Sequence, residues 1–147
     1  MLFRIYAAEQ ALLDLLFLNL DWANIGDAAG LQNSAAAGSF YISLHTADPD
    51  ETGTQNSNEV GYTSYARVAV ARSGAGFSRS ASVIENAALV QFPQCTGGSA
   101  TATHFGIGTD SSGAGNLLLK GALTSSLAIS NGIQPQFAAG DLTVTVD

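Results

Sequence analysis

The chain of 147 residues is poor in basic residues and in cysteine. It carries five Lys and Arg against twelve Asp and Glu, which gives a formal net charge of −7. A protein that binds duplex nucleic acid needs Lys and Arg to displace counterions from phosphates, so direct nucleic-acid binding is not expected. A single cysteine, Cys95, excludes an internal disulfide, and with two distant histidines it cannot build a zinc cluster.

The chain also lacks a hydrophobic segment that could span a bilayer. The apolar run at 11–20 is interrupted by Asp14, whereas a transmembrane helix needs about 20 predominantly apolar residues. Glu9 and Asp14 also stand where a signal peptide would have an uncharged stretch. The sequence therefore predicts a mature protein without a membrane or secretion segment.

Glycine, serine and threonine are abundant, with 16 glycines, which is typical of β proteins with many turns. The length predicts one domain over residues 1–147. We expect a helix at about 5–24, a glycine-rich connector at 25–39 and a β-sandwich from residue 40 to residue 147. This fold class is mainly β, a jelly-roll-like sandwich preceded by one helix.

The sandwich is expected to contain about eight strands, because apolar and polar residues alternate over short segments between turn signals. The expected strands lie at 40–45, 62–72, 83–92, 101–106, 117–123, 127–129, 133–137 and 142–147.

The expected helix is apolar over most of its circumference. At about 100° per residue, Gln10, Asp14 and Asp21 fall on one narrow stripe, and leucines with Phe17 cover most of the remainder. Such a helix must be covered on nearly every side. Two readings stay open: a helix buried within its own chain, or a helix that also binds a second copy or another protein.

The residue types that carry chemistry do not form a recognisable motif. His45 and His104 lie in expected strands, and no serine stands in a nucleophile-elbow pattern, so hydrogen-bonded structural histidines are the favoured reading. Asp48, Asp50 and Glu51 cluster in a loop after the first strand, but they lack the glycine and the closing glutamate of an EF-hand. We therefore expect no catalytic residue, no cofactor and no metal.

Five segments of the chain resemble a family of small virion proteins of tailed bacteriophages. The segments are WANIGDAAG at 22–30, YISLHTADPDETGTQ at 41–55, NEVGYTSYARVAVARS at 58–73, CTGGSATATHFGIGT at 95–109 and KGALTSSLAISNGI at 120–133. Members of this family are labelled tail-fibre-like proteins or resemble jelly-roll cement proteins, also called decoration proteins, of phage heads. The resemblance extends from about residue 12 to residue 146.

The resemblance implies a structural protein that is not an enzyme. Our first interpretation is a capsid cement protein, assembled in the host cytoplasm, that binds the major capsid protein on the outer surface of the head and forms a homo-oligomer, a dimer or trimer. The alternative is a tail-fibre or baseplate module that contacts a host surface. The candidate interface residues are Leu12, Leu13, Leu16, Phe17, Asp48, Asp50 and Glu51.

The fibre alternative brings its own candidate residues. A module that stacks against sugars needs exposed aromatic side chains, and Trp22, Tyr62 and Tyr65 are the available ones. Tyr62 and Tyr65 are three positions apart, so on one strand they are expected to point to opposite faces.

Overall fold

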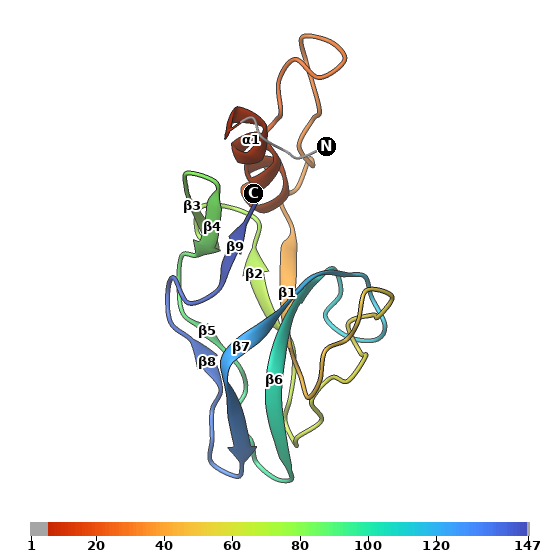
Figure 1. Cartoon of the computed structure of the whole chain (residues 1–147), viewed down its shortest axis with the longest axis vertical. Helices are drawn as coiled ribbons and strands as arrows, with labels where there is room; N and C mark the ends of the chain where they lie inside the picture. Colours follow the sequence, from red (N-terminus) through yellow and green to blue (C-terminus); the bar gives the residue numbers. More distant parts are fainter. Residues whose placement is uncertain (1–5, 147) are drawn as a thin grey trace. The chain divides into compact units, whose positions relative to one another are not determined.

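The computed structural model describes residues 6–146, and these residues are mainly β. The elements in chain order are α1 (Tyr6–Phe17), β1 (Ser39–His45), β2 (Val68–Ala71), β3 (Phe77–Ser80), β4 (Val83–Asn86), β5 (Val90–Gln91), β6 (Ser99–Gly108), β7 (Leu117–Ser130), β8 (Gln136–Phe137) and β9 (Thr143–Thr145). The strands form three sheets in the orders β2-β1-β6-β7, β3-β4-β9 and β5-β8 (Figure 1). The predicted fold class, a mainly β, sandwich-like fold behind one N-terminal helix, is confirmed.

The chain forms two compact units. The described residues of the first unit are 6–38, 71–90 and 137–146, and the second unit comprises residues 39–70 and 91–136. The single domain expected over 1–147 stays a prediction, and each unit is described by itself below.

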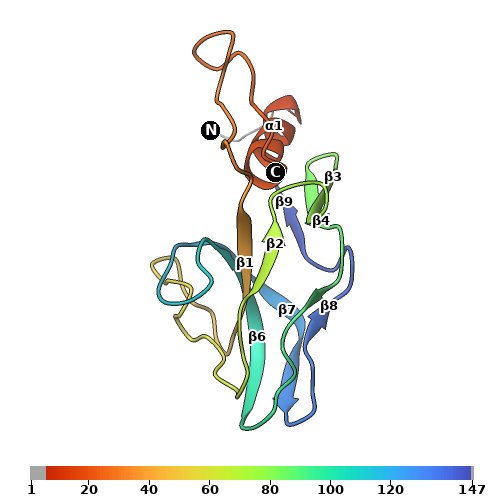
Figure 2. The same cartoon turned by 180° about the vertical axis from the view of Figure 1, so that it is seen from behind.

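The second unit is built on the antiparallel ladder of β1, β6 and β7. Tyr41 of β1 lies opposite Gly108 of β6, and β6 pairs in turn with β7 (Figures 1 and 2). We expected two strands at 117–123 and 127–129, but β7 is one strand of 14 residues. The pairing moves from Ala102–Leu127 to His104–Ala122, so residues 123–126 form a bulge that bends the strand without ending it.

The core of the second unit lies between this sheet and the segments that cover it. Its buried apolar side chains are those of Phe40, Ile42, Leu44, Val60, Tyr62, Val70, Phe92, Cys95, Ala102, Ile107 and Ile129. β1 departs from strict alternation, because its last four residues are all buried. One close approach requires glycine: a Cβ at Gly108 would lie 2.1 Å from Cδ of Gln55.

The strand expected at 62–72 is much shorter, and this prediction is wrong over its first half. Ser64 has a φ of 83°, and the Tyr65 amide donates to the Tyr62 carbonyl at 3.0 Å, so the chain turns here. Only Val68–Ala71 is strand. The strand expected at 83–92 is likewise divided into β4 and β5.

The first unit is a three-stranded sheet, β3-β4-β9, with α1 packed against β3 and β4. Leu13 and Phe17 of the helix are buried, and the ring of Phe17 meets that of Phe77 edge-on at 5.0 Å. Leu142 and Ile84 are buried in the same unit. The spacing of Glu9, Leu13 and Phe17, the three buried helix residues, is i, i+4, i+8, so they form one stripe along α1.

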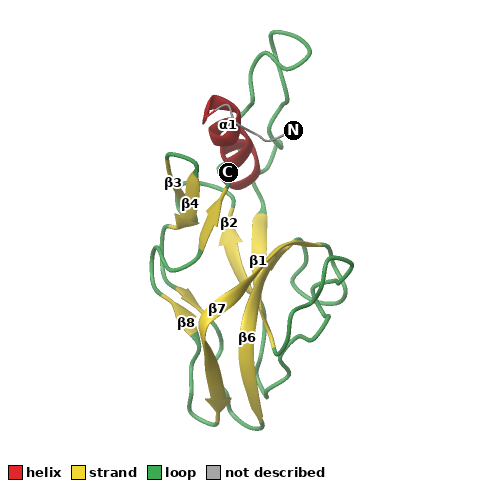
Figure 3. Cartoon of the chain, viewed as in Figure 1, coloured by secondary structure: helices red, strands yellow, loops and turns green. Residues whose placement is uncertain are grey.

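The helix expected at 5–24 ends at Phe17, and the predicted boundary at residue 24 is wrong; residue 5 lies outside the described residues. Asn19 has a left-handed φ of 55°, and its side chain bonds the backbone of Ser34 at 3.0 and 2.9 Å. Trp22 and Leu31 then pair as an antiparallel bridge. Residues 19–34, here named the 19–34 hairpin, therefore form an extended loop after α1 rather than its continuation (Figure 3).

Candidate interaction surfaces

The structure places a serine and a histidine in hydrogen-bond contact inside the second unit. The Ser43 hydroxyl lies 2.8 Å from Nε2 of His45, and Nδ1 of His45 lies 2.8 Å from the Ser57 carbonyl. A carbonyl can only accept, so Nδ1 carries the proton and Nε2 accepts from Ser43. Sequence reasoning missed Ser43, although residues two apart on a strand share a face.

This Ser–His pair does not have the access that catalysis requires. Ser43 and His45 are both 0% exposed, and a nucleophile or base must reach the substrate atom. The group that orients His45 is a backbone carbonyl instead of the carboxylate of a catalytic triad. Its geometry fits a structural contact that ties β1 to the loop after it.

The protonation of His45 gives the first prediction. Burial lowers the pKa of His45 below its ordinary 6.5, and Arg67 and His104 act in the same direction, while the Ser57 carbonyl and Glu59 oppose them. The unfolded chain then binds more protons than the folded chain just below pH 6.5. We therefore expect the free energy of unfolding to fall as the pH drops below about 6.5, measured by urea denaturation between about pH 5 and 8.

Two histidine variants provide the controls. His45→Gln is expected to remove this part of the pH dependence, because it removes the titrating group. His104→Gln, at a half-buried position, is expected to retain it. Equal slopes for wild type and His45→Gln would contradict the assignment to His45.

The acidic loop predicted as an interface is held by a lysine from β7. Nζ of Lys120 lies 2.6 Å from Oδ1 of Asp48 and 3.3 Å from Oε1 of Glu51. The hydrogen bond from Lys120 lowers the pKa of Asp48, and the same bond raises the pKa of Lys120. All three predicted acids are exposed. Sequence reasoning missed Lys120 because it stands far along the chain from the loop.

Glu51 and Lys120 also line a shallow surface pocket of about 290 Å³ in the second unit. The lining residues are Asp50, Glu51, Gly53, Leu117, Leu118, Leu119 and Lys120. Across residues 6–146, no group of three His, Cys, Asp or Glu side chains is placed to hold a metal ion. The pocket lining thus combines two acids, one lysine and three leucines.

A buried ion pair fixes the base of this loop. Arg67 donates from Nε and Nη2 to the two carboxylate oxygens of Glu59 at 2.7 and 2.8 Å. It also donates to the carbonyls of Asp110 and Gly113 at 2.9 and 2.7 Å. The Tyr65 hydroxyl donates to Glu59 at 2.8 Å, and burial raises the pKa of Tyr65. We name these groups the Arg67 cluster.

The Arg67 cluster joins two loops of the second unit, at 46–67 and 109–116. Figures 1 and 2 show these loops side by side at one end of the sheet. Gln55 adds a second connection: its backbone amide donates to the Ala114 carbonyl at 2.8 Å, and its side chain accepts from the Asp110 amide at 2.9 Å. The loop that carries the acids at 48–51 is therefore joined to the 109–116 loop by side-chain and backbone hydrogen bonds.

The tyrosines considered for sugar stacking form core contacts instead. Tyr62 is buried, and the rings of Tyr62 and Tyr65 meet edge-on at 5.3 Å. The expectation that they point to opposite faces is wrong, because the chain turns between them and does not continue as a strand. Tyr65 also stacks with Phe92. Of the three candidates, Trp22 stands in the 19–34 hairpin and is half-buried.

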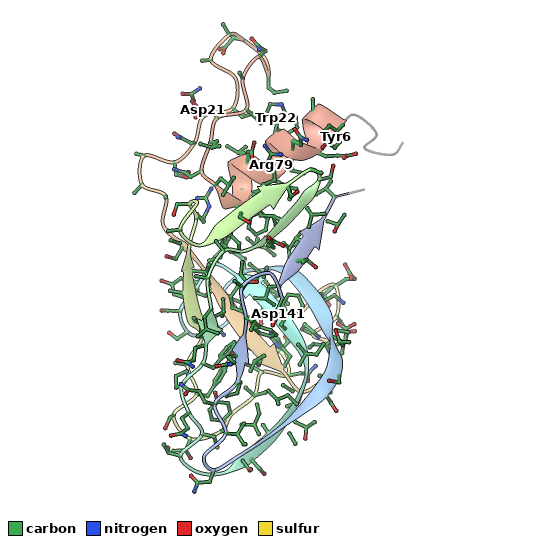
Figure 4. All side chains as sticks on the ribbon, turned by 90° about the vertical axis from the view of Figure 1, so that its left-hand side faces the viewer. Tyr6, Asp21, Trp22, Arg79 and Asp141 are labelled. Carbon is green, nitrogen blue, oxygen red and sulfur yellow. The ribbon has the colours of Figure 1, made fainter. Side chains whose placement is uncertain are left out.

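The acids of α1 face their own sheet, which sequence analysis did not anticipate. Arg79 of β3 donates from Nε to Asp14 at 2.5 Å, and the Ser82 hydroxyl donates to Glu9. Figure 4 shows Arg79 between the helix and the strands of this unit, with Tyr6 at the start of the helix. The carboxylates of α1 are thus used within the first unit.

Large apolar side chains remain exposed on α1 and on the hairpin that follows it. They are Tyr6, Leu16, Leu20, Ile25 and Leu31, with exposed fractions between 40 and 57%. Of the predicted interface leucines and phenylalanine, Leu13 and Phe17 are buried in the first unit, Leu12 is half-buried and Leu16 is exposed. An interface role for Leu12 and Leu16 stays a prediction.

Residues 6–145 of the chain match the family model described as podophage GP4 fiber I protein gp80. No curated protein matches the chain at a significant level. Within residues 6–146, no helix is long and apolar enough to cross a membrane. The family description names a fibre, so it agrees better with our alternative interpretation than with the capsid cement interpretation. Because the match covers almost the whole sequence, the chain belongs to the podophage GP4 fiber I protein gp80 family, a family of phage virion structural proteins.

Proposed function

We propose that this protein is a structural module of a podophage tail fibre and that it acts without catalysis. The observation that carries the proposal is the family match, which extends over residues 6–145 and therefore includes both units. The sequence resemblance to phage virion proteins, drawn from five separate segments, points the same way.

The described side chains support a mechanical role. The one Ser–His pair is buried. Within residues 6–146, each of the four basic side chains is bonded inside the chain: Arg67 to Glu59, Arg72 to carbonyls of α1, Arg79 to Asp14, and Lys120 to Asp48. Buried polar side chains in this range all have hydrogen-bond partners, which favours a single rigid packing.

A capsid cement protein bound to the major capsid protein is the weaker candidate. Both roles need a stiff β body and a contact surface, and neither needs chemistry. The family description names a fibre and says nothing of the head. The fibre interpretation therefore accounts for more of what is known about the chain.

Labelling of intact virions tests the proposal. Gold-coupled antibodies raised against the purified chain are expected to bind the tail, and virions from a phage in which this gene is deleted should show no label. Label spread over the head would overturn the fibre assignment and restore the cement interpretation. Label on neither structure would show that the chain is not an exposed virion component.

A further inference from the structure

β7 forms one end of its sheet, and its outer edge has no partner strand. In the order β2-β1-β6-β7 it pairs with β6 on one side. Among the described residues, no backbone–backbone hydrogen bond joins residues 117–129 to any segment other than β6. Such an edge presents a row of unpaired N–H and C=O groups at strand spacing. The bulge at 123–126 divides this row, and residues 117–122 form its first half.

The surface pocket of the second unit lies along this first half. Leu119 and Lys120 pair in register with β6, so their side chains lie on opposite faces of the sheet. Both nevertheless line the pocket, together with the two leucines before them. A pocket over one face of a strand would be lined by alternate residues. The four consecutive residues therefore indicate a pocket that follows the outer edge of β7, since β6 occupies the other edge.

The loop side of this pocket is acidic, because Asp50 and Glu51 line it. Within residues 6–146, no hydrogen bond or ion pair uses the Asp50 carboxylate. The Glu51 side chain is 92% exposed, and Nζ of Lys120 lies closer to Asp48 than to Glu51. One lysine is thus shared among three acids, which leaves an excess of negative charge. The apolar part of the lining includes Leu118, which is 48% exposed.

We propose that residues 117–122 of β7 bind an extended segment of a partner protein that carries a lysine or arginine. The backbone of the segment adds a strand to the free edge. The aliphatic stem of its basic side chain lies on Leu118, and the cation reaches Asp50 and Glu51. The inference goes beyond the proposed function, because it concerns a contact with a different protein and does not depend on a place in the tail or the head.

Other occupants fit this edge less well. A second copy of the chain is a poor source of the cation, because the four basic side chains within 6–146 are bonded inside the chain. A nucleic acid would bring phosphates against the acids of the pocket. A small-molecule site usually encloses most of its ligand in about 300–1,000 Å³, whereas this pocket is shallow and measures about 290 Å³.

Titration of the isotope-labelled full chain with a synthetic peptide, followed by NMR, tests the proposal. The probe is an octapeptide of alternating valine and lysine with blocked ends. The control peptide is the same octapeptide methylated on every backbone nitrogen, which keeps the charge but donates no backbone hydrogen bond. We expect the probe to shift the amide signals of residues 117–122 and 50–53 saturably, and the methylated peptide to bind at least about tenfold more weakly.

Two double variants test the role of the acids. Asp50→Asn/Glu51→Gln neutralises the acids of the pocket, so its dissociation constant for the probe is expected to rise at least about fivefold at low salt. Asp21→Asn/Asp27→Asn removes the same charge from exposed positions of the 19–34 hairpin in the first unit. This matched control should change the dissociation constant less than about twofold, because screened charges act only at short range.

Three results would overturn the proposal: equal affinity for the two peptides, signal shifts that avoid residues 117–122, or an equal loss of affinity in both double variants. The NMR spectrum of each variant shows whether it is folded, and the comparison of the two peptides on wild type needs no variant. Virion labelling tests the proposed function separately. A chain that binds the probe and labels the head keeps this contact and loses the fibre, whereas a chain that labels the tail without binding the probe does the reverse.

Discussion

Replacing Arg67 with methionine is expected to lower the free energy of unfolding by about 3–5 kcal/mol, as for other buried ion pairs that lose one partner. The side chains of Arg67 and Glu59 are only 3% and 15% exposed. Methionine fills a similar volume but donates no hydrogen bond. The Glu59 carboxylate would keep only the Tyr65 hydroxyl among the donors of the Arg67 cluster, and the carbonyls of Asp110 and Gly113 would each lose a donor.

Guanidinium denaturation of wild type and variant measures this loss. The control is the pair of Lys120 and Asp48, whose side chains are 24% and 49% exposed, so that solvent screens their attraction. Lys120→Met is expected to change stability far less. The double variant Glu59→Gln/Arg67→Met should recover part of the loss, since it leaves no charge buried without a partner. A loss for Arg67→Met no larger than that for Lys120→Met would contradict a stabilising Arg67 cluster.

Local patterns were enough to predict the regular parts of the fold. Phe40, Ile42 and Leu44 alternate with polar residues, and they form β1 over almost the expected range. Alternation also predicted β6, where pairing with β1 on one side and β7 on the other fixes the register. These strands could be predicted because side chains on a strand alternate between faces, whichever strand lies beside it.

Elements that depend on distant partners could not be predicted from local patterns. β3 contains Phe77 as its one apolar residue, so its sequence shows no alternation of apolar and polar residues. It forms a strand because it pairs with β4. α1 stops at Phe17, although apolar residues continue to Leu20, because Asn19 bonds Ser34 of the hairpin. In both cases the residue that decides the local structure lies outside the segment, so the segment's own pattern cannot reveal it.

The same limit applies to the candidate surfaces. The acids at 48–51 were found in the sequence, but their partner Lys120 and the contacts of Arg67 with the 109–116 loop come from residues distant in the chain. Helical periodicity placed Asp14 on a polar stripe, and a polar stripe ordinarily faces solvent. Asp14 instead faces the sheet, where Arg79 of β3 donates a hydrogen bond to its carboxylate.

Phe17→Ala is expected to lower the free energy of unfolding by about 3–5 kcal/mol, the usual range for removing a buried aromatic ring. Phe17 is 1% exposed and packs edge-on against Phe77, so alanine leaves a cavity between α1 and β3. The neighbouring Leu16→Ala, at a position that is 40% exposed, should change stability by less than about 1 kcal/mol. Urea denaturation at a protein concentration where wild type is monomeric gives both values.

The pair of variants separates the two readings of the helix that the sequence left open. If α1 is a core helix that is also partly exposed for a partner, Phe17→Ala should destabilise the single chain. Leu16→Ala should then leave the fold largely intact, because Leu16 keeps 40% of its surface exposed although it stands three positions after the buried Leu13. A destabilisation by Leu16→Ala as large as that by Phe17→Ala would show that Leu16 packs as tightly within the first unit as Phe17 does. That result would favour the reading of a helix buried within its own chain.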